Sequence, residues 1–277
     1  MRILLTNDDG IDSIGLHILA RAMRPHGDVV IVAPDSEYSG ASAAVGALHL
    51  SHPEARRVRV EGIDEAWSLT GPPALCVMFA RLGAFGAPFD LVVSGINPGA
   101  NVGRSVYHSG TIGATLSGRI GNISGVAVSQ SVSGFGVEGQ AWDEMIVGQQ
   151  WDTAADVASA FVGGLAGALP GDDAVVVNLN VPNCPVGEIK GWRRTTVGRD
   201  PQRPVSKAEL VPIVGLEGAY RVSMAWGDPL DLPDDTDGGA VENGYVSVTY
   251  LSRLHEIDRP DLSAAEASLT QLVPAAD

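Results

Sequence analysis

The sequence predicts an α/β fold: a doubly wound, Rossmann-like, mostly parallel sheet followed by a C-terminal β-rich extension. Two observations lead to this prediction. Short β-branched runs with unbroken apolar centres alternate with helical patterns up to about residue 181, as expected for parallel strands that helices cover on both faces. After Pro182 the alternation stops, and strand-like pieces are separated by connectors rich in Pro, Gly and Asp.

The first half of the chain supplies two clear strand and helix pairs. Residues 2–6 (RILLT) form an apolar run, and residues 14–23 place Ile14, Leu19 and Met23 at helical spacing. Residues 28–33 (DVVIVA) predict a second buried strand that Pro34 closes. Weaker strands are expected at 47–50 and 57–61, and a helix is expected at 73–82, where Pro stands in the first turn.

The next elements continue the same alternation. We expect strands at 90–94, 126–129 and 174–181, and helices at 110–120 and 151–169. Residues 131–150 are rich in Gly, Ser and Gln and indicate an insertion or long loop. Later strands are expected at 221–225 and 245–250, and a short helix with a frayed tail at 263–277. We therefore divide the chain into an α/β domain, 1–185, and a β-rich extension, 186–277, that serves as an arm for oligomerisation.

The amino-acid composition argues against nucleic-acid and membrane partners and against a disulfide-rich protein. Eighteen basic and 33 acidic residues give a net charge of −15, which argues against a stable nucleic-acid partner because such binding needs Lys and Arg against phosphates. The longest apolar segment, 154–169, contains Asp156 and falls short of the ~20 residues of a membrane span. Cys76 and Cys184 are too few for a disulfide framework. We expect reduced thiols and a cytoplasmic protein that binds no membrane.

Three polar loops follow predicted strands, at residues 7–10, 35–40 and 94–103. Ligands of doubly wound sheets bind beyond the carboxyl ends of the strands, so the three loops are expected to meet at one site. Asp8 and Asp9 stand side by side and repel each other unless a cation lies between or beside them, and hard oxygen ligands favour Mg²⁺, Mn²⁺ or Ca²⁺ over zinc. The alternative is that one aspartate caps a helix and the other is solvated.

Residues 107–111 (YHSGT) come directly before a predicted helix. Small residues at a helix N-terminus can bind an anion through free N–H groups and the helix dipole. Plain capping by Ser109 or Thr111 is the alternative. The run GANVG does not match the dinucleotide fingerprint G-x-G-x-x-G, and the chain contains neither a P-loop motif nor G-x-S-x-G.

An ordered set of segments resembles the SurE family of stationary-phase survival protein nucleotidases. The matching segments are 2–11, 33–42, 94–103, 108–111, 177–182, 188–192, 235–237 and 244–249. Each segment alone is a weak signal, but together they cover most of residues 1–255 in the family's order. The resemblance implies a metal-dependent phosphomonoesterase that hydrolyses nucleoside 5′- and 3′-monophosphates.

The resemblance also implies the residues of the site and the assembly. One divalent ion, Mg²⁺ or Mn²⁺, per subunit is expected on the ligands Asp8, Asp9, Ser39 and Asn97. The phosphate is expected on Asn101, Ser109, Gly110 and Thr111. The residues expected to take part in catalysis are Asp8, Asp9, Asn101 and Ser109. The expected partners are a small nucleotide substrate and further copies of the chain, in a homodimer or homotetramer that exchanges C-terminal segments.

Some positions depart from the family's pattern: Pro72, Leu75, Ser117 and Tyr250. They leave two alternatives open, a phosphatase for another small phosphomonoester and a non-catalytic protein that binds a nucleotide or metal. His108 is a candidate leaving-group acid or, alternatively, a packing residue. Five aspartates between 228 and 237 lack the spacing of a calcium loop, so a solvated acidic connector is expected there rather than a second cation site.

Overall fold

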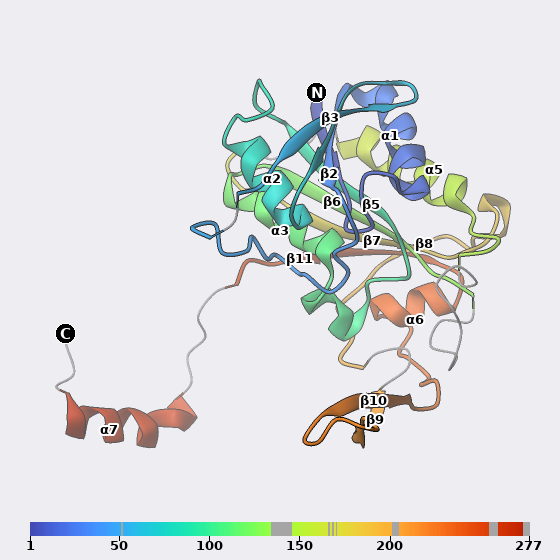
Figure 1. Ribbon diagram of the computed structural model, residues 1–277. Coiled ribbons are helices and arrows are strands. Elements are labelled where there is room, and N and C mark those ends of the chain that lie inside the picture. The colour runs from blue at the N-terminus through green and yellow to red at the C-terminus, as the bar shows by residue number, and fades with distance from the viewer. Residues whose placement is uncertain are drawn as a thin grey trace.

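A nine-stranded sheet forms the centre of the computed structural model (Figure 1). The structure describes residues 1–50, 52–133, 146–165, 167, 169, 171–200, 205–254 and 260–273. The strands of the sheet are β1 (Arg2–Thr6), β2 (Asp28–Pro34), β3 (Ala55–Val60), β4 (Ile63–Leu69), β5 (Leu91–Pro98), β6 (Ser124–Gln130), β7 (Val176–Val181), β8 (Trp192–Arg194) and β11 (Val246–Leu251).

The strand order confirms the predicted doubly wound α/β fold. The strands lie in the order β3-β4-β2-β1-β5-β6-β7-β11-β8. The six central strands in this order, β4, β2, β1, β5, β6 and β7, run parallel to one another. Strand β3 runs antiparallel to β4, and β11 runs antiparallel to β7. The chain reverses its direction of winding between β1 and β5, which is the place where such sheets bind ligands.

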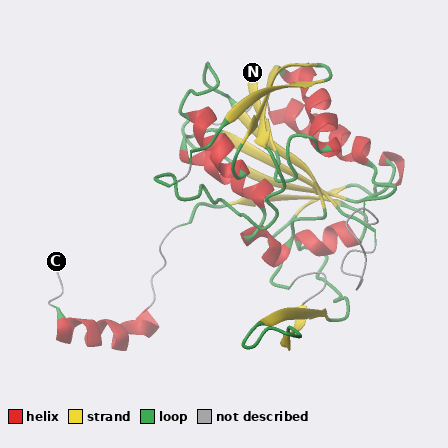
Figure 2. Cartoon of the chain, viewed as in Figure 1, coloured by secondary structure: helices red, strands yellow, loops and turns green. Residues whose placement is uncertain are grey.

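Helices cover both faces of the sheet (Figure 2). The helices are α1 (Ile14–Met23), α2 (Pro73–Arg81), α3 (Gly110–Ile120), α5 (Trp151–Leu165), α6 (Asp237–Glu242) and α7 (Ser263–Leu272). Short 3-10 turns are η1 (Arg24–His26), η2 (Gly103–Tyr107), η3 (Val186–Glu188) and η4 (Pro260–Leu262). Helices α1 and α5 pack on one face with Leu16, Leu19 and Ala158 buried, and α2 and α3 pack on the other face with Val77 and Ala114 buried.

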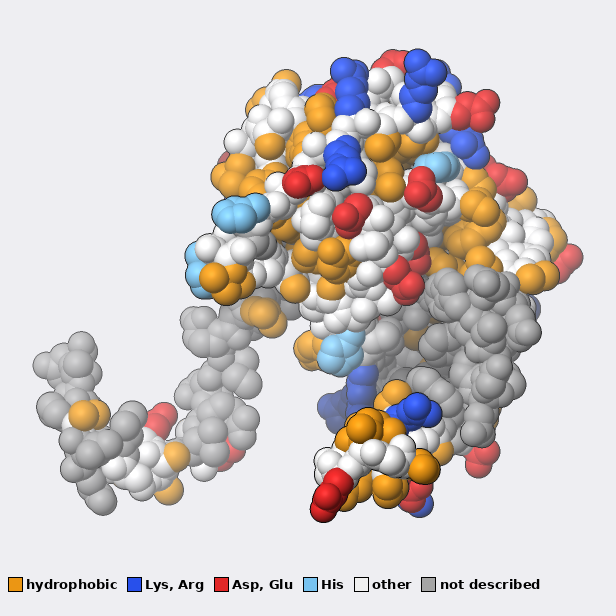
Figure 3. All heavy atoms as spheres, in the orientation of Figure 1, with side chains coloured by type: hydrophobic (Ala, Val, Ile, Leu, Met, Phe, Trp, Pro, Cys, Tyr) orange, Lys and Arg blue, Asp and Glu red, His pale blue; other side chains and the backbone are white. Residues whose placement is uncertain are grey.

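The C-terminal part of the chain contributes to the main sheet as well as to separate elements. Strand β11 pairs with both β7 and β8, and α6 packs beside β11. A two-stranded hairpin, β9 (Val205–Pro212) and β10 (Tyr220–Trp226), stands apart from the sheet. It exposes apolar side chains, among them Leu210, Val222 and Met224 (Figure 3). The boundary between residues 185 and 186 stays a prediction.

One strand was predicted wrongly, and three strands were missed. Residues 47–50 form a turn instead of a strand, with Leu48 and Leu50 exposed. Strand β4 went unpredicted because Asp64 and Glu65, two consecutive acidic residues, interrupt its apolar pattern near the start. Strands β8 and β9 were also missed. Of the expected insertion at 131–150, residues 134–145 lie outside the described part of the chain, as do residues 274–277 of the expected tail.

Within the described ranges, no helix has both the length and the apolar character that crossing a bilayer requires.

Replacing Leu19 by Ala is expected to lower the free energy of unfolding by about 2–5 kcal/mol, because a fully buried side chain in α1 leaves a cavity. The matched control is Ile14→Ala in the same helix, where the side chain is 61% exposed and the cost should stay below about 1 kcal/mol. Urea unfolding followed by circular dichroism measures both. Equal losses in the two variants would contradict the assignment of the buried face of α1.

Candidate active site

The three polar loops that follow β1, β2 and β5 lie at one edge of the sheet. The backbone N–H of Tyr38 donates to the carbonyl of Asp8 at 2.7 Å, and the N–H of Ile11 donates to the carbonyl of Pro34 at 2.8 Å. These bonds join the first two loops. The third loop is joined to the end of β6 by a 2.7 Å bond from the N–H of Gly99 to the carbonyl of Gln130.

Asp8 is buried against the N-terminus of α3. Its Oδ1 accepts a 2.6 Å hydrogen bond from the hydroxyl of Thr111, and only 3% of the residue is exposed. A Cβ at Gly110 would lie 2.8 Å from Asp8 Oδ2, so only glycine allows this approach. Burial raises the pKa of Asp8, and hydrogen bonds from Thr111 and Gly110 oppose that rise. The helix dipole further favours the carboxylate at this position.

Asp9 carries a buried oxygen that lacks a partner. Its Oδ2 makes no hydrogen bond, and its pKa is raised to about 8 by burial, then by the negative charges of Asp8 and Glu37. No ion pair with Lys or Arg involves these three acids in the described part of the chain. Among the described residues, no three His, Cys, Asp or Glu side chains form a cluster that could hold a metal ion. A divalent cation still fits the two neighbouring aspartates, because it would pair the unpartnered oxygen and offset the repulsion between the carboxylates, with neutral oxygens completing the ligand set.

Ser39 and Asn97 bring neutral oxygens from the second and third loops. Ser39 is exposed, and its hydroxyl donates to Glu37 at 2.7 Å. The pairing of β5 with β6 shifts register between Ser94 and Asn97. The Asn97 amide nitrogen donates to the carbonyl of Gly99 at 2.7 Å, which orients the side chain. Asp8, Asp9 and Ser39 therefore lie on the first two loops, whereas Asn97 lies near the end of β5, which extends to Pro98 where the sequence predicted a loop from residue 94. The role of all four residues in binding a metal stays a prediction.

Asn101 is held firmly by the sheet. Its N–H donates to Asn180 Oδ1 at 2.8 Å, and its carbonyl accepts from Asn178 Nδ2 at 2.8 Å. Its side-chain amide donates to the hydroxyl of Ser129 at 2.9 Å. The sequence analysis gave these three partners no role. The signal available for them was polar residues in otherwise apolar strands, since a buried polar side chain needs a partner.

Ser109 and Thr111 both hydrogen bond within the protein. Ser109 is the N-cap of α3, and its Oγ accepts from the N–H of Ile112 at 3.1 Å, so the capping alternative is observed. Thr111 binds Asp8, as described above. His108 is exposed, and its carbonyl accepts from the N–H of Ser42 at 3.0 Å. The assignment of Ser109, Gly110 and Thr111 to phosphate stays a prediction.

The acidic connector is solvated only in part. Asp228, Asp231, Asp234 and Asp235 are exposed, as expected. Asp237 is fully buried, so the expectation of a solvated side chain is wrong for this residue. Sequence analysis treated the five aspartates alike. The overlooked signal was Thr236 before Asp237 and two glycines, the pattern of a capped helix start, which the structure shows as the N-terminus of α6.

The departures from the family's pattern lie in packing contacts rather than among the predicted ligands. Leu75 is buried in the core under α2, and the hydroxyl of Ser117 in α3 donates to the carbonyl of Ala74 in α2 at 3.1 Å. Pro72 is the N-cap residue of α2. Tyr250 is half-exposed on β11, with the guanidinium of Arg194 5.1 Å from the ring centroid. These positions shape the contact between α2 and α3 and the edge of the sheet.

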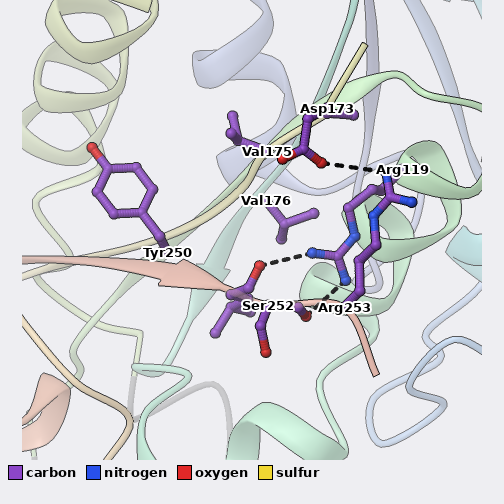
Figure 4. A pocket seen from close by; sticks show the side chains of 9 residues that line it. Arg119, Asp173, Val175, Val176, Tyr250, Ser252 and Arg253 are labelled. Atoms are coloured by element: carbon purple, nitrogen blue, oxygen red, sulfur yellow. Dashed lines mark hydrogen bonds and ion pairs between the residues drawn. The ribbon is translucent and has the colours of Figure 1, made fainter. Parts of the chain in front are cut away.

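A separate cavity of about 300 Å³ lies at the other end of α3 (Figure 4). There Arg119, in the last turn of the helix, donates to the carbonyls of Leu251 and Ser252 at 2.7 and 2.9 Å. Arg253 pairs with Asp173 at 3.4 Å. Eleven helical residues span about 16 Å, so this cavity is distinct from the site around Asp8. Arg119 fastens the end of β11 to α3, and Arg253 joins the residues after β11 to the segment that precedes β7.

Comparison with known proteins decides the family. The model of the family described as survival protein SurE matches residues 3–203. The chain belongs to the SurE family. Its relatives include a protein of Acinetobacter baumannii named 5′-nucleotidase SurE, which is 37% identical over 259 residues, or 91% of this chain and 93% of that protein. A SurE relative of Mannheimia succiniciproducens with the same name is 36% identical over 91% of this chain and 92% of that protein.

A solved structure supports the same conclusion. The SurE protein from Aquifex aeolicus superposes with a TM-score of 0.72 at 30% identity, covering 97% of this chain and 99% of that one. The predicted family and fold are thus both confirmed. The site residues are not tested by these likenesses, and their roles are proposed below.

Asp9→Asn is expected to raise the stability of the metal-free protein at pH 8. The pKa of Asp9 is about 8 in the folded state against an ordinary value of 3.8, so the folded state binds the proton more tightly. Wild-type stability therefore falls as the pH rises from about 4 to 8. Because one pKa unit corresponds to about 1.4 kcal/mol, the variant should gain at least about 1 kcal/mol at pH 8.

Urea unfolding in EDTA between pH 5 and 8 measures this difference. Asp12→Asn, which changes an exposed carboxylate, is the control and should run parallel to the wild type. Parallel curves for Asp9→Asn and the wild type would contradict the buried, charge-repelled state of Asp9. Saturating Mn²⁺ should flatten the wild-type dependence, since a bound cation favours the ionised carboxylate.

Proposed function

We propose that this member of the SurE family is a divalent-metal-dependent phosphomonoesterase that hydrolyses nucleoside 5′- and 3′-monophosphates to nucleoside and phosphate. The observation that carries the proposal is the neighbouring pair Asp8, which is buried, and Asp9, whose buried Oδ2 lacks a partner, at the carboxyl edge of the sheet. The names of the relatives, 5′-nucleotidase SurE, support the nucleotide as substrate. Activity on 3′-monophosphates rests on the family resemblance alone.

The proposed cofactor is one Mg²⁺ or Mn²⁺ ion per subunit. Its proposed ligands are Asp8, Asp9, Ser39 and Asn97. When bound, such an ion supplies Lewis-acid polarisation of a phosphoryl oxygen and offsets the repulsion between the carboxylates and an anionic substrate. Carboxylate, hydroxyl and amide oxygens are the hard donors that these ions prefer.

The chain's own residues bind and orient the phosphate. The side-chain amide of Asn101 donates one of its two N–H groups to the hydroxyl of Ser129. Its second N–H can therefore donate to a phosphate oxygen. Ser109 accepts from Ile112 and therefore keeps its hydroxyl proton for the substrate. Gly110 and Thr111 stand at the N-terminus of α3, whose dipole favours an anion. Donors fixed in this way stabilise charge as it builds up on the phosphoryl oxygens.

Two features of the chain bear on the compartment and the oligomeric state of the proposed enzyme. We propose a cytoplasmic homodimer or homotetramer that exchanges C-terminal segments. Cys76 and Cys184 are free thiols, and α7 lies away from the sheet at the end of the chain (Figure 1). Light scattering on the full chain and on a chain ending at residue 254 tests the exchange: loss of the oligomer in the shorter chain is expected.

The proposed activity is tested by phosphate release from a panel of 5′- and 3′-nucleoside monophosphates. The panel is run with Mg²⁺, with Mn²⁺ and with EDTA. Wild type should release phosphate only with metal. Asp8→Asn should lower kcat by about 10³-fold or more, because it removes a proposed ligand and half of the charge that holds the ion. Asp12→Asn, an exposed carboxylate in the same loop region, should retain activity.

The outcomes separate the competing functions. Release from non-nucleotide phosphomonoesters alone would indicate a phosphatase for another small substrate. Metal and nucleotide binding without release from any substrate would indicate a non-catalytic binding protein. Undiminished, metal-independent release in Asp8→Asn would contradict the proposed site.

A further inference from the structure

Asp237 is a buried carboxylate that the proposed chemistry does not use. It is fully buried at the start of α6. Its two oxygens accept from the N–H of Gly103 at 3.1 and 3.0 Å, and its Oδ1 also accepts from the N–H groups of Gly198 and Gly238 at 2.9 Å each. One side chain thus fixes the backbone of three segments that are remote in sequence.

Two of these segments form a continuous unit in the C-terminal part of the chain. The N–H of Asp237 donates to the carbonyl of Thr196 at 2.9 Å, and the N–H of Thr196 donates to the carbonyl of Asp235 at 3.0 Å. Gly103 meets this unit closely: its φ is +54°, and a Cβ there would lie 2.7 Å from the carbonyl oxygen of Asp200. The backbone of Gly103 therefore lies directly against the carboxylate of Asp237 and the backbone of Asp200, and a side chain at position 103 would not fit.

The third segment is the loop that carries Asn101. Gly103 lies two residues beyond it. The loop has three anchors: Gly99 on the end of β6, Asn101 on the asparagines of β7, and Gly103 on Asp237. The first two anchors come from the main sheet, whereas the third comes from the segment that follows residue 186, in which the carbonyl of Arg199 also accepts a 2.9 Å hydrogen bond from Arg104 Nε. Hydrogen bonds to a charged acceptor are about twice as strong as neutral ones, which makes the third anchor a firm one.

We infer that Asp237 is a positioning residue for the proposed phosphate site: by holding the N–H of Gly103, it fixes the loop that places Asn101 against the phosphate. This inference rests on the proposed function. It also ties the C-terminal part of the chain to the proposed phosphate site through the carboxylate of Asp237, beside the hydrogen bond from Arg104 to the carbonyl of Arg199. A displacement of about 1 Å in a group that positions substrate can cost up to 100-fold in rate, so a loosened loop should be measurable.

The test is Asp237→Asn, with Asp231→Asn as a matched control that removes an exposed carboxylate from the same connector. Asparagine keeps the shape but sets an NH₂ group against an N–H donor. We expect the KM for a nucleoside monophosphate, and the Kd for inorganic phosphate in the presence of Mn²⁺ by calorimetry, to rise about tenfold or more. The Kd for Mn²⁺ alone should stay within about twofold, since Asp8, Asp9 and Ser39 lie on other loops and Asn97 is held in β5 by its pairing with Ser129 of β6.

The results distinguish three cases. Unchanged phosphate affinity together with a lowered Tm would overturn the positioning role and leave Asp237 as a structural residue. A rise in the Kd of Mn²⁺ equal to that of phosphate would also overturn it, because the effect would then be general. If the wild type itself neither binds phosphate nor releases it, the proposed function fails, and this is seen before any variant is compared.

A measurement on the wild type covers the case in which Asp237→Asn does not fold. Amide hydrogen exchange should show peptides containing Gly103 and Gly198 opening together, and phosphate with Mn²⁺ should slow exchange in both. Protection of the Gly103 peptide without any change at Gly198 would overturn the coupling.

Discussion

Two neighbouring carboxylates, Asp8 and Asp9, emerge at the end of a central strand with little access to water. The arrangement of the surrounding loops and helices depends on accommodating them. Strand β1 lies between β2 and β5, so the residues after it emerge where the sheet reverses its winding. Asp8 is accommodated by Thr111 and the start of α3. Asp9 keeps an oxygen without a partner. This arrangement is costly without a cation, because a buried polar oxygen without a partner destabilises the fold and the charged form of Asp9 is disfavoured.

Hydrogen bonds fix the other residues at this edge of the sheet, near Asp8 and Asp9. Asn101 is bonded through its main chain to β7 and through its side chain to β6. The C-terminal segment adds the contact of Asp237 with Gly103. The strands β8 and β11 that complete the sheet belong to this same part of the chain. The geometry of the proposed phosphate site and the folding of the C-terminal part are therefore linked by hydrogen bonds.

Sequence alone predicted those parts in which one physical signal dominates. Strand β1 and helix α1 match their predicted bounds because an unbroken apolar run and a 3.6-residue period have few alternative interpretations. Strand β4 was missed because it contains Asp64 and Glu65. The loops around Asp8 and Asn97 were predicted from their place after strands. Asp237 was not, since burial depends on contacts with Gly103 and Gly198 that no local pattern encodes.

Charge explains why the proposed site depends on a metal ion rather than on basic side chains. The chain carries a net charge of −15, and Glu37 adds to the negative potential at Asp9. The positive end of α3, on which the phosphate is proposed to bind, also faces the carboxylate of Asp8, whose negative charge weakens its attraction for an anion. An anionic substrate approaching this edge therefore meets attraction only if a cation neutralises the aspartates first. In the proposed enzyme, binding of the ion and binding of the phosphate are consequently expected to be cooperative, each raising the affinity for the other by the same factor.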